Sequence, residues 1–162
     1  MGRIGIYGGT FNPPHRGHMQ AARQAVELLN LDKLLLIPDH APPHKTMPEG
    51  TPAAQERLEL VRLTAREIPR AEASDLELLR EGRSYTADTV ELLHRTYPGD
   101  ELFLLMGTDM FLAFPQWREP ETICRYATLV VMLREREEPK LQQELQAQAQ
   151  HIRKKLDGKV KF

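Results

Sequence analysis

The stretch that decides the fold is IGIYGGTFNPPHRGH, residues 4–18. It starts as an apolar strand, passes through Gly8, Gly9 and a proline pair, and ends in two histidines at the expected first turn of a helix. Glycines let a backbone turn tightly and approach a ligand, and a helix N-terminus offers N–H groups to an anion. His15 and His18 are three residues apart and share one helix face. The stretch therefore predicts a phosphate site between a strand and a helix.

The rest of the chain alternates between apolar runs typical of strands and segments in which apolar residues recur at helical spacing. The expected strands are residues 4–7, 33–38, 71–79, 102–106 and 128–133, and the expected helices are residues 21–29, 58–65, 85–97, a short helix from Pro120, and 140–156 on the surface. Lys159–Phe162 has the pattern of the start of a strand. This order predicts an α/β fold, a Rossmann-like doubly wound parallel sheet with helices on both faces.

Three segments with unusual composition follow predicted strands. They are residues 8–18, residues 39–45 and residues 107–109, and the middle one begins a segment, 39–53, that holds four prolines and should form a loop. Ligands of doubly wound sheets bind beyond the carboxyl ends of the strands. We therefore expect these three segments to form one site.

Length and composition exclude several classes of protein. With 162 residues, 41% of them hydrophobic and 28% charged, we expect one domain over residues 1–162 with a substantial core. A formal net charge of −1 gives no electrostatic reason to expect nucleic acid or an anionic membrane as partner. The single cysteine, Cys124, excludes an intramolecular disulfide and suits a reducing compartment. Met1 leads directly into a strand, and no apolar run approaches the length of a membrane span, so we expect a cytoplasmic protein.

Four segments in order along the chain resemble one known superfamily. They are His15-Arg16-Gly17-His18, Pro42–Lys45, Ser84–Thr89, and Gly107–Asp109 followed by Pro115–Trp117. The first resembles the histidine, any residue, glycine, histidine signature of the nucleotidyltransferase superfamily. Together they are most similar to the bacterial nicotinate-mononucleotide adenylyltransferases, and the resemblance extends from Met1 to about Leu133.

The resemblance implies transfer of the adenylyl group of ATP to the 5′-phosphate of nicotinate mononucleotide, giving deamido-NAD and pyrophosphate. Because the attacking phosphate is already an anion, the protein needs to align the reactants and neutralise charge rather than supply a base. The implied catalytic residues are His15, His18 and Lys45, the histidines donating to the ATP phosphates and the lysine holding the terminal ones. Mg²⁺ would bind through ATP phosphates rather than in a protein cage.

The resemblance also implies the remaining site residues. Those for ATP are Gly8, Gly9, Thr10, Phe11, His15, His18, Gly107 and Asp109, and those for the mononucleotide are Thr10, His44, Lys45, Tyr85, Thr86 and Trp117. Asp109 would accept a hydrogen bond from a ribose hydroxyl, and Trp117 would stack on the nicotinate ring. Backbone N–H groups at Tyr85 and Thr86 would bind the substrate carboxylate.

Structural interpretations of the same residues stand beside these roles. Asp109 is equally typical of the N-cap of a helix that begins at Met110, and a single tryptophan is usually a core residue. Ser84 or Thr86 would simply cap the helix at residues 85–97. The histidine pair could be incidental, or could join His40 and His44 in a zinc site, but no spaced cysteine pair supports zinc and no protein-bound metal is predicted.

Two departures from the family pattern keep other functions open. Asn12 stands where the family usually has aspartate, and residues 134–162 lack the Ser-Ser-Thr segment and arginine that the family carries near its C-terminus. Either the sequence continues past Phe162 or part of the ATP site is absent. A non-catalytic nucleotide-binding or sensor protein is therefore an alternative. A phosphopantetheine adenylyltransferase is another, although Pro42–Lys45 and Pro115–Trp117 argue against it. The sequence leaves open the choice between nicotinate and nicotinamide mononucleotide, and it is compatible with a homo-oligomer.

Overall fold

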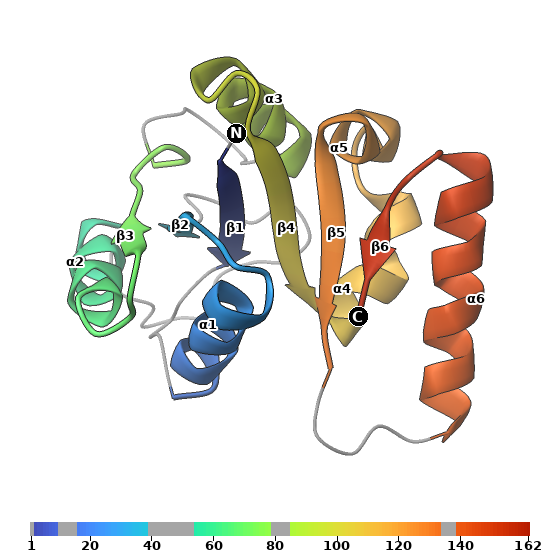
Figure 1. Cartoon of the computed structure of the whole chain (residues 1–162), viewed down its shortest axis with the longest axis horizontal. Coiled ribbons are helices and arrows are strands. Elements are labelled where there is room, and N and C mark those ends of the chain that lie inside the picture. The colour runs from blue at the N-terminus through green and yellow to red at the C-terminus, as the bar shows by residue number, and fades with distance from the viewer. Residues whose placement is uncertain (1, 10–15, 39–53, 79–84, 134–138) are drawn as a thin grey trace.

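The computed structural model describes residues 2–9, 16–38, 54–78, 85–133 and 139–162. The described residues form a six-stranded parallel sheet in the order β3-β2-β1-β4-β5-β6 (Figure 1). The strands are β1 (Arg3–Gly9), β2 (Lys33–Pro38), β3 (Ala71–Ala73), β4 (Glu101–Gly107), β5 (Ala127–Met132) and β6 (Val160–Lys161). The helices are α1 (Arg16–Leu28), α2 (Ala54–Ala65), α3 (Thr86–Thr96), α4 (Thr108–Ala113), the 3₁₀ helix η1 (Phe114–Gln116), α5 (Pro120–Tyr126) and α6 (Pro139–Lys155).

The sheet is apolar on both faces because helices cover both. Successive residues of β4 alternate between two buried clusters, with Leu104 and Met106 in one and Phe103 and Leu105 in the other. Residues of α1 and α2 complete the second cluster, and residues of α3, α4, α5 and α6 complete the first. The predicted doubly wound sheet is therefore confirmed.

The sheet order reverses direction between β1 and β4. From β1 the chain builds outward through β2 and β3, and it then returns to the other side of β1 to add β4, β5 and β6 (Figure 1). Such a reversal leaves a crevice where the connections after the two central strands depart to opposite faces. The carboxyl ends of β1 and β4 are thus the place where this fold can accept a ligand.

Several predicted elements formed almost as expected. β2 coincides with residues 33–38, and α5 begins at Pro120, where a missing N–H costs no helical hydrogen bond. The predicted strand start at residues 159–162 is confirmed by β6, which pairs in parallel with β5. The expected surface helix is α6, which also buries a stripe of three residues against the core, Leu145, Ala149 and Ile152. The proline-rich segment 39–53 lies outside the described residues.

The strand predicted at residues 71–79 is wrong beyond Ala73. After β3 the Ser74 N–H still donates to Leu36 O at 2.8 Å, but the chain then turns, and the Leu78 N–H donates to Asp75 O at 2.9 Å. A turn closed by its own backbone hydrogen bonds satisfies groups that a longer edge strand would leave exposed.

Two predicted helix caps are also wrong. The N-cap of α3 is Tyr85, whose side chain makes no capping hydrogen bond, so Thr86 is the first helical residue rather than the cap. Ser84 lies outside the described residues. The N-cap of α4 is Gly107, which places Asp109 inside the first turn rather than ahead of the helix.

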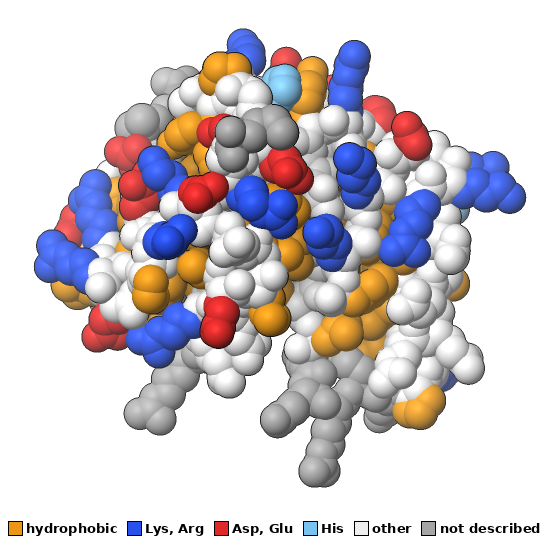
Figure 2. All heavy atoms as spheres, in the orientation of Figure 1, with side chains coloured by type: hydrophobic (Ala, Val, Ile, Leu, Met, Phe, Trp, Pro, Cys, Tyr) orange, Lys and Arg blue, Asp and Glu red, His pale blue; other side chains and the backbone are white. Residues whose placement is uncertain are grey.

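Basic and acidic side chains are interspersed over the face of the molecule shown in Figure 2. This distribution agrees with the formal net charge of −1. The two signs lie close together at β2 and β3, where Lys33 Nζ lies 3.5 Å from Glu72 Oε1 and Arg70 Nη1 lies 3.9 Å from Asp32 Oδ1.

Candidate active site

The described part of the predicted site lies where β1 and β4 end and α1 and α4 begin. Gly8 and Gly9 close β1, Gly107 closes β4, and His18 stands in the first turn of α1. The first turn of α1 contains no acidic residue that would repel an anion. The side chain of His18 lies outside the described part, as do Thr10, Phe11, Asn12, His15, His40, His44 and Lys45 as whole residues. The fold places the ends of β1 and β4 side by side, which brings the described parts of the first and third segments together. Residues 39–45 lie outside the described residues, and the roles of these side chains stay predictions.

The glycines at this edge are not required by packing. Gly8 and Gly9 are extended residues of β1, paired with Ile37 and Pro38, so the predicted tight turn at these two residues is wrong. Among the described atoms, a Cβ at Gly8 would meet only Ile37 O at 3.7 Å, an ordinary contact, and a Cβ at Gly107 would meet nothing within 4 Å. Because neither position has a left-handed backbone, the glycines do not relieve strain, and the described residues leave the space beside them open.

Asp109, the residue predicted to bind a ribose hydroxyl, is exposed to solvent in the first turn of α4. Gly107 holds an extended backbone, with φ −79° and ψ 173°, and Thr108 is buried at the first position of the helix. Asp109 follows on the exposed side of the first turn. A carboxylate there is favoured by the positive end of the helix, and an exposed one can accept a hydrogen bond from a sugar hydroxyl. Asp109 therefore interacts with the positive end of α4 from within the first turn instead of acting as the N-cap. Its binding to ribose stays a prediction.

The predicted mononucleotide residues from two distant segments lie close together. Tyr85 is the extended N-cap of α3, and the guanidinium carbon of Arg118 lies 4.7 Å from the centroid of its ring. Arg118 directly follows Trp117, whose indole packs 5.2 Å from the Phe114 ring at an interplanar angle of 55°. Trp117 is half-buried against the core cluster. Its packing in the core is therefore compatible with an exposed ring face that could stack on a ligand. The structure therefore joins the start of α3 to the turn that carries Trp117.

Sequence reasoning missed three buried polar residues. Arg57, Glu77 and Thr89 are 2%, 5% and 1% exposed. The Thr89 Oγ1 hydroxyl donates to Glu77 Oε2 at 2.9 Å, which ties the turn after β3 to the beginning of α3. The burial of Arg57 had a signal in the sequence, because Arg57, Val61 and Ala65 recur four residues apart on one face of α2. Arg118 was also missed, although its place directly after the single tryptophan of the sequence was a signal for it.

Cys124 takes no part in this site. It is a buried residue of α5 next to Gly158, and burial, helped by the charge of Glu121, raises the pKa of the thiol to about 11. A thiol with so high a pKa is a poor nucleophile at neutral pH. Within the described part of the chain, no three His, Cys, Asp or Glu side chains are grouped to hold a metal ion, and no helix is long and apolar enough to cross a membrane.

Comparisons with known proteins agree with this arrangement. The sequence matches the Cytidylyltransferase-like family over residues 6–156. It is 40% identical over 134 residues to a protein of Shouchella clausii and 43% identical over 132 residues to one of Geobacter metallireducens, both named "Probable nicotinate-nucleotide adenylyltransferase". These alignments cover 83% and 82% of this chain, and the chain spans 69% and 61% of the length of the two relatives.

A solved structure with the same fold is the Plasmodium falciparum nicotinic acid mononucleotide adenylyltransferase complexed with NaAD. It superposes with a TM-score of 0.74 at 16% identity, covering 89% of this chain and 71% of that one. At this identity the structure supports the fold alone, while the relatives above establish the family that the four sequence segments predicted. The chain thus belongs to the Cytidylyltransferase-like family and, within it, to the nicotinate-nucleotide adenylyltransferases.

Proposed function

We propose that this chain transfers the adenylyl group of ATP to nicotinate mononucleotide, releasing pyrophosphate and forming deamido-NAD for NAD biosynthesis. The observation that carries the proposal is the identity of 40–43% to relatives of that name over more than four fifths of the chain. The space that the described residues leave at Gly8 and Gly107, where the sheet order reverses, supports a nucleotide at this edge.

In the proposed reaction, a 5′-phosphate oxygen of the mononucleotide attacks the α-phosphorus of ATP, and the bond from that phosphorus to the leaving pyrophosphate breaks. The nucleophile carries its own negative charge, so no side chain has to remove a proton. We assign to His15, His18 and Lys45 the task of donating hydrogen bonds to phosphate oxygens as charge shifts from one oxygen to another. The position of His18 at the start of α1 supports this role, because the N-terminal end of a helix also favours phosphate.

We expect Mg²⁺ to bind through ATP. Among the described residues, the exposed Asp109 carboxylate is the acidic group in the first turn of α4, and no cluster of three ligating side chains accompanies it. Mg²⁺ commonly keeps several waters and is held through the phosphates of a nucleotide, so this role needs no cage of protein ligands. Bound there, Mg²⁺ would neutralise charge on the phosphates, while Asp109 accepts a hydrogen bond from the ribose.

The mononucleotide would lie between α3 and the turn after η1. The half-buried indole of Trp117 provides a rigid surface for the pyridine ring. At the start of α3, the Tyr85 side chain makes no capping hydrogen bond, and the first N–H groups of a helix have no partner within the helix. Those N–H groups would receive the carboxylate of the pyridine.

A pyrophosphate-release assay tests the proposal. The protein should release pyrophosphate from ATP and Mg²⁺ only when a pyridine mononucleotide is added, and deamido-NAD should appear in equal amount. Release that depends on phosphopantetheine would instead support the coenzyme A alternative, and no release with either would support the sensor alternative. Nicotinate mononucleotide should also quench the fluorescence of Trp117, the single tryptophan.

The remaining expectations are part of the same proposal. We propose a cytoplasmic enzyme in which residues 1–162 act as one domain, with small-molecule substrates and with neither nucleic acid nor membrane as partner. The single, buried Cys124 and the net charge of −1 support these points. A homo-oligomer is compatible with the proposal, and size-exclusion chromatography with light scattering would determine the state.

A further inference from the structure

Arg118 is a cation placed at the junction of the two segments that carry the proposed mononucleotide residues. Its guanidinium lies over the ring of Tyr85, 4.7 Å from the centroid, and its side chain is 60% exposed. Stacking uses the flat face of a guanidinium and leaves its N–H groups directed sideways. The contact therefore places the cation beside the start of α3, and a contact with a ring face does not itself use the hydrogen-bond donors of the guanidinium.

One carboxylate already lies near this cation. Glu119 Oε2 is 3.8 Å from Arg118 Nε, which is beyond hydrogen-bonding distance, and the Glu119 side chain is 52% exposed. Such a solvent-exposed pair is weak and leaves the guanidinium able to bind a second anion. Asp88 is a second exposed carboxylate in the first turn of α3. Among these described residues, Arg118 is thus the group that favours an anionic ligand over a neutral one.

We propose that Arg118 makes this site select a pyridine mononucleotide that bears a carboxylate over one that bears a carboxamide. The inference rests on the proposed function, since it assumes that the pyridine ring lies beside Trp117. A guanidinium can donate two parallel hydrogen bonds to a carboxylate, whereas a carboxamide offers one acceptor oxygen and an NH₂ group that opposes a cation. Arg118 therefore determines specificity and takes no part in the chemical step.

The test compares kcat/KM for nicotinate mononucleotide and for nicotinamide mononucleotide in the wild type and in Arg118→Gln. Loss of a charge-assisted hydrogen bond should lower the value for the acid by roughly 10- to 100-fold. The value for the amide should change by less than about threefold, because a neutral group loses little when the cation is removed. Arg118→Lys keeps the charge but loses the planar fork, and its preference should fall between the two.

Two further variants separate specificity from structure. Arg125→Gln is the matched control, because Arg125 is also an exposed arginine over a tyrosine ring, with its guanidinium carbon 5.7 Å from the centroid of Tyr126, and no proposed site residue adjoins it. It should leave the preference unchanged. Glu119→Gln removes the competing carboxylate, so it should raise the preference for the acid by about twofold to fivefold. Glu119 has a left-handed backbone with φ 50°, and glutamine of nearly equal size leaves that strain as it is.

Equal losses for both mononucleotides in Arg118→Gln, or a wild type that prefers the amide, would overturn the inference while leaving the adenylyl transfer intact. A wild type that is inactive with both mononucleotides would instead overturn the proposed function itself. A loss confined to the acid, together with the opposite effect of Glu119→Gln, would establish Arg118 as the residue that reads the carboxylate.

Discussion

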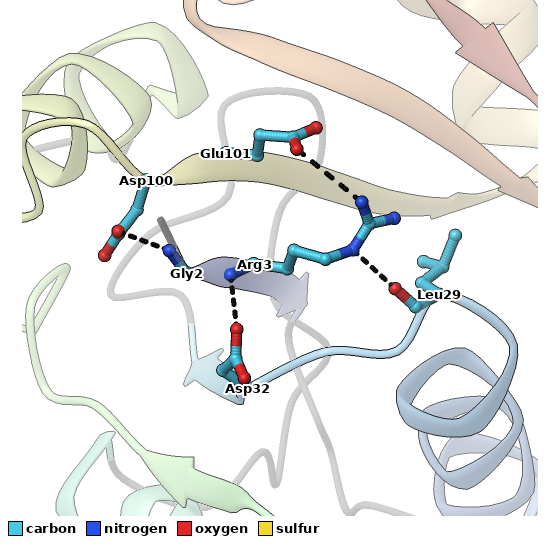
Figure 3. Close-up of polar contacts among 6 residues, drawn as sticks. All are labelled: Gly2, Arg3, Leu29, Asp32, Asp100 and Glu101. Atoms are coloured by element: carbon cyan, nitrogen blue, oxygen red, sulfur yellow. Dashed lines mark hydrogen bonds and ion pairs between the residues drawn. The ribbon is translucent and has the colours of Figure 1, made fainter.

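The two ends of the same sheet use polar groups in opposite ways. At the amino ends of β1, β2 and β4, charged side chains bind neighbouring backbone (Figure 3). The Gly2 N–H donates to Asp100 Oδ1 at 2.8 Å, the Arg3 N–H to Asp32 Oδ2 at 2.8 Å, and Arg3 Nε to Leu29 O at 2.7 Å, while Arg3 Nη1 lies 3.6 Å from Glu101 Oε1. These groups satisfy one another within the fold.

At the carboxyl ends the described residues leave space and exposed polar groups. Gly8 and Gly107 have room for a side chain that they do not carry, and Asp109 and Arg118 are exposed. We call the amino ends of the strands the closed end of the sheet and the carboxyl ends the open end. Packing and hydrogen bonds at the closed end stabilise the fold, while the open end is left for ligand binding. Substitutions at the amino end should therefore affect unfolding, and substitutions at the carboxyl end should affect the reaction.

The largest effect should come from His18→Ala. If the hydrogen bond of this side chain is made mainly in the transition state, kcat should fall by roughly 10²- to 10³-fold while KM for the mononucleotide changes little. Steady-state kinetics with each substrate varied in turn would measure both constants.

His94→Ala and His151→Ala are the controls for this prediction. His94 stacks on Tyr126 with ring centroids 4.3 Å apart, and His151 is exposed on α6, so neither adjoins the proposed phosphate site. Comparable loss of kcat in all three variants would mean that the losses arise from destabilisation, and the site would be misassigned.

The second prediction breaks the closed end. A Cβ at Gly158, ahead of β6, would lie 2.7 Å from Ile152 Cγ2 and 2.9 Å from Cys124 Sγ. Both neighbours are buried and have little room to move, so Gly158→Ala should lower the free energy of unfolding by about 1–3 kcal/mol. Urea unfolding would measure this loss, and kcat of the folded protein should stay near the wild-type value. A large fall in kcat without loss of stability would contradict the division between the two ends.

The third prediction fills the open end with the same methyl group. Gly8→Ala meets only an ordinary contact at 3.7 Å and replaces a glycine inside a strand, so the melting temperature should stay the same or rise slightly. The methyl group would occupy space that the proposal assigns to ATP, and KM for ATP should rise by about tenfold, which corresponds to 1.4 kcal/mol of lost binding. Unchanged ATP kinetics would place the nucleotide elsewhere along this edge.

Local sequence patterns were sufficient for much of the fold. The run of apolar residues at 33–38 predicts β2 at its observed bounds. The spacing of glycine, proline and histidine after residue 7 predicts the passage from β1 to α1 at the point where the sheet order reverses. The end of β3 could not be predicted, because residues 74–78 are polar enough for either an edge strand or a turn, and their own backbone hydrogen bonds decide between the two.

The site was less predictable than the fold because its details depend on contacts between distant segments. The stacking of Arg118 on Tyr85 and the hydrogen bond from Thr89 to Glu77 join residues whose proximity no local pattern encodes. The caps of α3 and α4 were wrong for a related reason, since Tyr85 and Gly107 hold the required extended backbone without a capping side chain. Glycine has no side chain, and tyrosine is not one of the short polar residues (Ser, Thr, Asp, Asn) by which a cap is recognised in a sequence.

The smallest expected effect tests whether water reaches the buried thiol of Cys124 at the amino end of the sheet. Burial beside Gly158 raises the pKa of the Cys124 thiol from an ordinary 9.0 to about 11, so between these values the unfolded chain loses a proton that the folded protein keeps. The unfolded state gains stability from that ionisation, and the free energy of unfolding should therefore fall as the pH rises from 9 toward 11. At pH 10 the thiol should account for a loss of about 1 kcal/mol.

Urea unfolding of the wild type and of Cys124→Ala at pH 8 and pH 10 isolates the contribution of the thiol, because all other titrating groups are common to both chains. Cys124→Ala should be less stable at both pH values through its cavity, but the gap between the two proteins should narrow by that amount at pH 10. A gap independent of pH would mean that water reaches the thiol, and that the amino end of the sheet is less tightly closed than its packing indicates.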